Sequence, residues 1–286
     1  MNLLLLVLLV VLLVGAGLCL WRLSDLRADR REWLRLAAIQ PARPALFDPA
    51  MLAGLPPVAQ RYFRATIAPG TPLYPVAAIR MTGQFSLGDA ASPNYLDMQA
   101  NQLLAAPEGF VWAMRAGHGA MRISGSDSAK WTRFWLLAVL PVARMGGSED
   151  HRRSAFGRYV AEAAFWTPAA LLPGPDTMWQ DTGGNSTRVT LRRDRMEQSV
   201  DLMLDDSGRP VQVSFMRWSD ANPDKRFRLQ PFGGTLSDFR TFEGFTLPTR
   251  VEAGNFFGTK DYFTFFKADV SEIRFADLTP HRRVGI

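Results

Sequence analysis

Residues 199–215 have the sequence SVDLMLDDSGRPVQVSF, which predicts two antiparallel strands joined by a tight turn. Val200, Leu202 and Leu204 occupy every second position before the turn, and apolar residues recur with the same period after it. This alternation places one set of side chains on the buried face of a sheet. The intervening Asp-Asp-Ser-Gly supplies residues that favour turns.

The same alternation recurs on both sides of this hairpin, at 79–87, 110–115, 187–192 and 249–253, and aromatic-rich segments follow through residue 275. Short gaps rich in glycine, asparagine and aspartate separate several of these segments, as expected for strands connected by tight turns. The pattern predicts a mainly β (α+β) fold, with a curved antiparallel sheet or a half-open barrel.

Two helices are expected, near residues 56–67 and 148–166, and one or both of them should cover the sheet. Proline suits the first turn of a helix, and Pro56-Pro57 opens the first one. Ser148 is expected to cap the second helix, which Thr167-Pro168 should end. Residues 48–286 are interpreted as a single domain.

Residues 3–21 are uncharged and consist mostly of leucine and valine. A helix of this length spans roughly 28 Å, close to the ~30 Å thickness of the hydrocarbon core of a bilayer. Trp21 would lie at the interface. We therefore interpret residues 1–21 as a single-pass transmembrane anchor. A cleaved signal peptide is disfavoured, because the stretch before the apolar run has no Lys or Arg and no small-residue cleavage site precedes Arg22.

The net charge of +6 is partly local. The stretch 22–47, a basic juxtamembrane segment and linker, holds six arginines against three carboxylates and supplies half of the excess. The remaining charge forms no basic stripe, so nucleic-acid binding is not predicted. The arginines that follow the span suit lipid headgroups, and the positive-inside rule places the β domain in the cytoplasm.

Motifs for metal or cofactor binding are not found, and neither a metal nor a cofactor is predicted. Cys19 is the only cysteine and lies inside the apolar run, while His118, His151 and His281 stand far apart. Gly117-His118-Gly119 lacks the third glycine of a dinucleotide-binding loop.

The apolar run of residues 134–142 is too short to span a bilayer. Three interpretations stay open for it: a core strand, a core helix, or a surface that touches the membrane.

Aromatic residues are numerous, with eight Trp and nineteen Phe. They either fill a solid core or line an apolar cavity between the concave sheet face and the 148–166 helix. Glu162 is a lone charge in an apolar segment and is expected to pair with Arg158 at i−4, or with Arg115 or Arg250. If a cavity exists, the predicted binding residues are Phe110, Trp112, Met114, Trp166, Val213 and Phe215, with Glu162 and Arg115 as polar anchors.

The order of several short motifs resembles that of an uncharacterised bacterial family of membrane-anchored proteins with a domain of unknown function, over roughly residues 50–276. The motifs are LPPVAQRY at 55–62, GFVW at 109–112, RYVAEA at 158–163, WTP at 166–168 and LPTRVE at 247–252. The resemblance does not extend through residues 125–145.

This resemblance implies a strand order similar to the lipoprotein-carrier fold, in which helices cover the concave face of a curved sheet that binds acyl chains. It also implies a single-pass protein of the bacterial cytoplasmic (inner) membrane. Those carriers work outside the cytoplasmic membrane, so the resemblance places the β domain on the side opposite to that given by the charge rule.

Three functions follow from these patterns. The first is non-enzymatic, membrane-tethered binding of a lipid or other apolar ligand. The second is a scaffold or envelope-interaction domain with a solid core, which binds a partner protein. The third is an enzyme that uses Glu162 or His151 as its general base.

Overall fold

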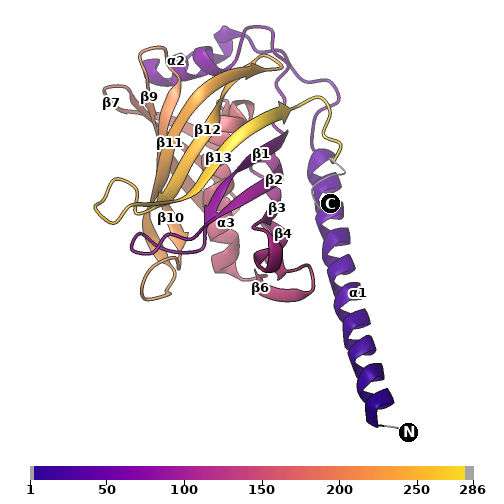
Figure 1. The fold of residues 1–286 in the computed structure, drawn as a ribbon. Helices are drawn as coiled ribbons and strands as arrows, with labels where there is room; N and C mark the ends of the chain where they lie inside the picture. The colour runs from indigo at the N-terminus through magenta and orange to yellow at the C-terminus, as the bar shows by residue number, and fades with distance from the viewer. Residues whose placement is uncertain (1–2, 281–286) are drawn as a thin grey trace.

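The computed structural model describes residues 3–280, which form a 13-stranded sheet and three α-helices (Figure 1). The helices are α1 (Leu3–Ala37), α2 (Pro57–Thr66) and α3 (Glu149–Trp166). The strands are β1 (Ala77–Ser86), β2 (Tyr95–Ala105), β3 (Gly109–Ala116), β4 (Ile123–Ser128), β5 (Trp131–Leu136), β6 (Leu140–Gly146), β7 (Thr177–Gly183), β8 (Ser186–Arg193), β9 (Met196–Leu204), β10 (Pro210–Ser219), β11 (Arg228–Phe242), β12 (Phe245–Asn255) and β13 (Phe263–Arg274).

The sheet consists of two antiparallel meanders, in the order β6-β5-β4-β3-β2-β1-β13-β12-β11-β10-β9-β8-β7. Strands β1 and β13, the first and last in the chain, pair in the middle of the sheet. Strands β6 and β7 form its two edges, and α3 connects them. The predicted mainly β fold is confirmed, and the sheet stays open instead of closing into a barrel.

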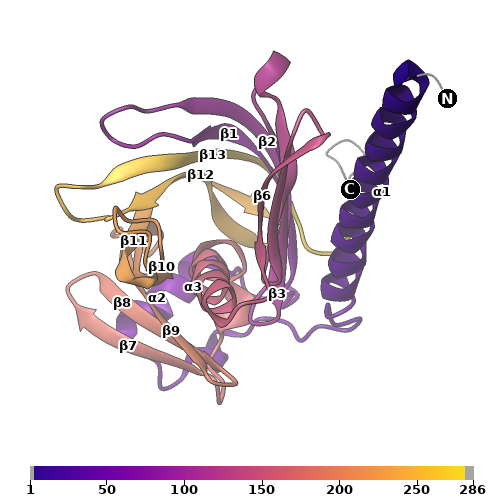
Figure 2. The ribbon, with the colours of Figure 1, turned by 90° about the horizontal axis from the view of Figure 1, so that it is seen from below.

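Helices lie on both faces of this curved sheet. The strands curl around α3, while α1 runs outside, along the wall that contains β3 and β6 (Figure 2). Helix α2 packs against β7, β8 and β12 and covers one end of the concave face.

The hairpin at 199–215 forms as predicted, from β9 and β10. Leu202 is opposite Val213, and a register shift follows Pro210. This register buries Val213 and Phe215 in the core beneath α3. The predicted capping of α3 is also confirmed, because the Ser148 side chain accepts a hydrogen bond from the His151 backbone amide at 3.1 Å.

Strand β3 corrects the expectation of one buried and one wetter face. Phe110 and Trp112 face the main core, but Val111 on the opposite face is buried too. There it packs with Trp33 and Leu36 of α1 in a second, smaller core. The end of α1 thus covers a sheet face that the alternation alone assigned to water.

Candidate functional site

A cavity of about 240 Å³ lies between α3 and the concave face of the sheet. Its walls come from α3, from β1, β3, β4 and β5 on one side and from β10 to β13 on the other. Most of its surface is apolar. The lining residues are Phe85, Trp112, Asp127, Thr132, Phe134, Arg158, Ala161, Glu162, Phe165, Trp166, Val213, Phe215, Arg217, Phe232, Val251, Ala253, Phe265 and Phe266.

The structure brings some of the predicted binding residues to this cavity and leaves others away from it. Those that line it are Trp112, Glu162, Trp166, Val213 and Phe215. Phe110 and Met114 belong to the surrounding core. Arg115 lies on the other face of β3, where it is exposed and lines a separate shallow hollow. Successive strand residues point to opposite faces, so Arg115 does not act as a polar anchor here.

The polar part of the cavity is an ion-pair network centred on Arg158. Its guanidinium contacts Glu162 at 2.7 Å, the i−4 pair expected from the sequence, and Asp127 of β4 at 2.6 Å. Gln102 donates a further hydrogen bond to Glu162, and Thr132 donates one to Asp127 at 2.6 Å. Burial acts to lower the pKa of Arg158, but the two carboxylates outweigh it and raise that pKa.

Arg217 of β10 is the second guanidinium in the cavity, and no sequence pattern marked it as a site residue. Among residues 3–280, no carboxylate is in ion-pair contact with Arg217, and its buried Nε lacks a hydrogen-bond partner. Its guanidinium carbon lies 5.0 Å from the centroid of the Phe232 ring. Burial, followed by repulsion from Arg158, lowers its pKa to about 10. The guanidinium is therefore charged at neutral pH, and its Nε–H is free to donate a hydrogen bond to a ligand.

Trp112 adds a second unused donor to the cavity wall. The side chain is 4% exposed, and its indole Nε1 has no hydrogen-bond partner within the described part of the chain. Buried donors in folded proteins are nearly always paired, so each exception calls for an explanation.

The candidate acid/base residues occupy structural positions. Glu162 is held by Arg158 and Gln102, and the His151 ring lies 3.1 Å from the carbonyl oxygen of Ser128. Within residues 3–280 there is no cluster of three or more His, Cys, Asp or Glu residues that could hold a metal ion. His281 lies outside the described residues.

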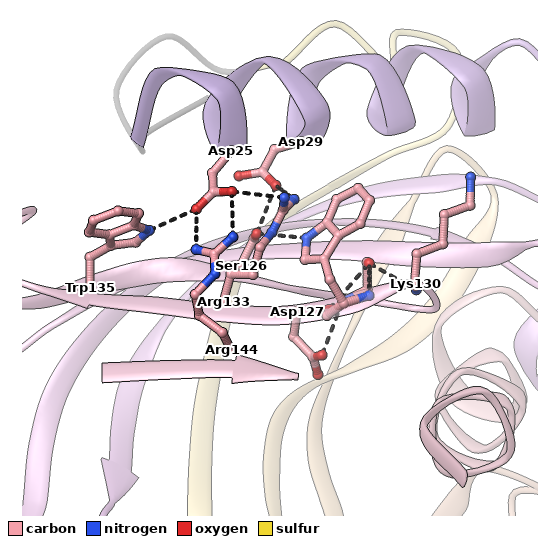
Figure 3. Close-up of polar contacts among 10 residues, drawn as sticks. Asp25, Asp29, Ser126, Asp127, Lys130, Arg133, Trp135 and Arg144 are labelled. Atoms are coloured by element: carbon pink, nitrogen blue, oxygen red, sulfur yellow. Dashed lines mark hydrogen bonds and ion pairs between the residues drawn. The ribbon is translucent and has the colours of Figure 1, made fainter. Parts of the chain in front are cut away.

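A buried ionic contact fixes α1 on the outer face of the sheet (Figure 3). Asp25, Asp29 and Glu32 are 2–5% exposed. Asp25 and Asp29 point toward β4, β5 and β6 (Figure 3). Their partners come from those strands and the turn between two of them. Asp25 contacts Arg144 at 2.7 Å and Arg133 at 2.9 Å, Asp29 accepts from Ser126 at 2.7 Å, and Glu32 contacts Lys130 at 2.6 Å.

These carboxyl groups differ in their titration because burial and pairing oppose each other. At Asp25, burial favours the neutral acid, but hydrogen bonds from Arg144 and Trp135 prevail and lower the pKa. Glu32 behaves in the same way, through Arg35 and Lys130. At Asp29 burial prevails, and the pKa is raised.

The spacing of the three acids in the sequence is itself a signal for this contact. Asp25, Asp29 and Glu32 follow one another at i, i+4 and i+7, which places them on one face of a helix. The charge pattern of this segment predicted lipid contact for its arginines and no role for the three acids. Their partners on β5, on β6 and in the turn before β5 are more than 90 positions away and could not be identified without the fold.

The other half of α1 meets the requirements for a membrane span. Helix Leu3–Ala37 has a mean hydropathy of 3.2 over its most apolar 18 residues, and that window is 0% buried by the protein. A membrane anchor and a signal sequence both fit this description.

The family model described as "Family of unknown function (DUF6544)" matches residues 45–268. This match confirms the resemblance to a family of unknown function. A search of curated proteins gives no match.

Three solved structures are similar to this chain over most of their own length. A LolA superfamily protein from Nitrosomonas europaea has 13% identity and a TM-score of 0.37, with 78% of this chain and 93% of that chain covered. A putative outer membrane lipoprotein-sorting protein domain from Vibrio parahaemolyticus has 12% identity and a TM-score of 0.36, with 77% and 91% covered. A DUF1329 family protein from Desulfovibrio piger has 11% identity and a TM-score of 0.34, with 77% and 90% covered.

Proposed function

We propose that this chain, which belongs to the family of unknown function DUF6544, is a membrane-tethered protein that binds a lipid or similar amphiphile without catalysing a reaction. The observation that carries the proposal is the apolar cavity between α3 and the sheet, with an unpaired arginine in its wall.

The volume of the cavity supports a ligand. Protein interiors are normally packed as densely as organic crystals, and empty spaces are small. The cavity of about 240 Å³ exceeds the roughly 150 Å³ engineered cavity that takes up benzene. Aromatic and aliphatic side chains surround it, so an alkyl chain would be favoured there over water. This observation disfavours the scaffold hypothesis, which requires a solid core.

The unused donors support a polar group on that ligand. Arg217 and Trp112 both line the cavity, and each has a buried N–H without an acceptor. A carboxylate, phosphate or ester oxygen would supply the missing acceptor, and an anion would also relieve the cost of burying the Arg217 charge. Asp127 and Glu162 are already bonded to Arg158, so they do not meet this need.

The membrane anchor gives such a cavity its context. Residues 3–21 as an uncleaved anchor would keep the cavity beside a lipid source at high effective concentration. Exposed arginines at 27, 30 and 31 follow the span, and on the positive-inside rule we propose that the β domain lies on the cytoplasmic side.

Native mass spectrometry of the full chain, released from detergent micelles and followed by lipid analysis, tests the proposal. We expect one tightly held lipid per chain. Lipids that surround the anchor could give the same mass, so the control is a double variant, Ala161→Leu with Ala253→Leu, which fills the cavity and leaves α1 unchanged. Loss of the lipid in this variant supports the cavity. Equal lipid in both proteins, or none in the wild type, rejects the proposal.

A further inference from the structure

The hairpin of β5 and β6 has an exposed apolar tip. Leu137 and Ala138 form its turn, with positive φ angles of 53° and 61°. Clusters of large apolar side chains on a protein surface mark a region that something else covers. Those at and near the turn of the hairpin are 39–54% exposed and comprise Leu137, Val139, Leu140 and Val142.

Strand β5 runs alongside α1 in the direction of the apolar segment. At one end Lys130 contacts Glu32, and at the other the Trp135 and Trp21 rings lie 5.6 Å apart. The five strand residues from Lys130 to Trp135 and the eleven helical residues from Glu32 to Trp21 both span about 16 Å, so β5 and α1 run roughly parallel over this length. Three further residues carry the turn about 10 Å past Trp21, alongside the uncharged part of α1.

We infer that the tip of this hairpin inserts into the lipid bilayer next to α1, an inference that rests on the proposed anchor. Its surroundings have the chemistry of a membrane interface. Trp21 and Trp135 pair at the base of the tip, and the Arg144 guanidinium lies 4.3 Å from the centroid of the Trp21 ring. Arg22 donates a hydrogen bond to Ser124 at the same level. Tryptophan and arginine favour the headgroup region, and the apolar tip continues beyond it.

The strand that leads to this tip, β5, also forms part of the cavity wall. Trp135 and Arg133 face α1, while Phe134 and Thr132, on the other face of β5, line the cavity. The bilayer and the cavity would therefore share one strand, which connects lipid contact with the proposed binding site.

Lipid-dependent fluorescence quenching tests this contact in the full chain. The protein is reconstituted in phosphatidylcholine–phosphatidylglycerol vesicles that contain a spin-labelled lipid, with an environment-sensitive fluorophore on one cysteine. The native Cys19 reports on the anchor. The V142C and S207C variants, both without Cys19, report on the hairpin and on an exposed turn beside α2.

We expect the V142C label to be quenched nearly as strongly as the Cys19 label, and at least about threefold more than the S207C label. Quenching at Cys19 alone overturns the hairpin contact and keeps the anchor. Weak quenching at both Cys19 and V142C rejects the anchor and the hairpin contact together. If V142C is shielded from lipid and from aqueous iodide alike, a second copy or another protein covers the tip, and the inference is also wrong.

Discussion

Asp25 accepts two hydrogen bonds from Arg144, at 2.7 and 3.0 Å, across 119 positions of the sequence. The pair joins the helix that leaves the apolar segment to β6, an edge strand of the sheet. Strand β6 pairs with one neighbouring strand only, so this side-chain contact gives it a second attachment to the domain. Because the carboxylate is buried and bonded in two places, it also fixes the rotation and height of α1 against the domain.

Replacing Asp25 with Asn should destabilise the protein by about 3 kcal/mol, because Arg144 would lose its buried counter-charge and Arg133 would keep only Asp29. The free energy of unfolding, measured with urea on the full chain in detergent, checks this. The matched control is Glu197→Gln, which breaks an exposed pair with Arg192 and should cost less than about 1 kcal/mol. Similar losses in both variants would contradict the structural role of the α1 contact.

Low pH should reduce the free energy of unfolding through the protonation of Asp25 and Glu32. Their pKa values are lowered in the folded state, so their stabilisation is complete above the ordinary values of 3.8 and 4.5 and is lost as the pH falls through the folded values. Asp29 acts in the opposite sense. Its pKa is raised in the folded state, so the folded protein gains stability as the pH falls through that pKa toward 3.8.

Unfolding free energies measured across acidic pH should therefore separate these two residues. Asp25→Asn should flatten the loss of stability below pH 3.8, whereas Asp29→Asn should make the protein lose stability at a higher pH than the wild type. Parallel curves for the two variants would refute the assignment.

Removing the unpaired guanidinium should weaken the binding of anionic amphiphiles. Arg217→Met keeps the apolar stem and should raise the Kd for a long-chain fatty acid about 10- to 100-fold, the value of a charge-assisted hydrogen bond. Affinity for the uncharged alcohol of the same chain length should change little. Titration of both probes with the variant measures this, with the exposed Arg228→Met as control. Equal weakening for acid and alcohol would mean that Arg217 shapes the cavity and does not bind the head.

Glu162→Gln should destabilise the fold by about 3 kcal/mol, because Arg158 would keep only one of its two carboxylates in a buried site. Thermal unfolding measures the loss. Glu149, in the exposed first turn of the same helix, is the matched control, and Glu149→Gln should cost less than about 1 kcal/mol. Unchanged stability in Glu162→Gln would instead favour a chemical role for this carboxylate.

Periodicity in the sequence determined much of this protein. The alternation around residues 199–215 predicted the hairpin, Ser148 predicted the start of α3, and the uncharged run 3–21 predicted the long apolar helix. Each of these features depends on side chains close together in the chain, where a period of two or 3.6 residues states which face is buried. The ion pair of Arg158 with Glu162 was predictable for the same reason.

Only the tertiary structure decided what those faces contact. Val111 is buried because the C-terminal end of α1 packs against it. Arg217 lines the cavity because the fold brings β10 next to α3 and Phe232. The buried acids of α1 meet Arg133 and Arg144 across more than 100 positions. Contacts between elements that are distant in the chain are properties of the folded arrangement, and chain neighbours alone do not encode them.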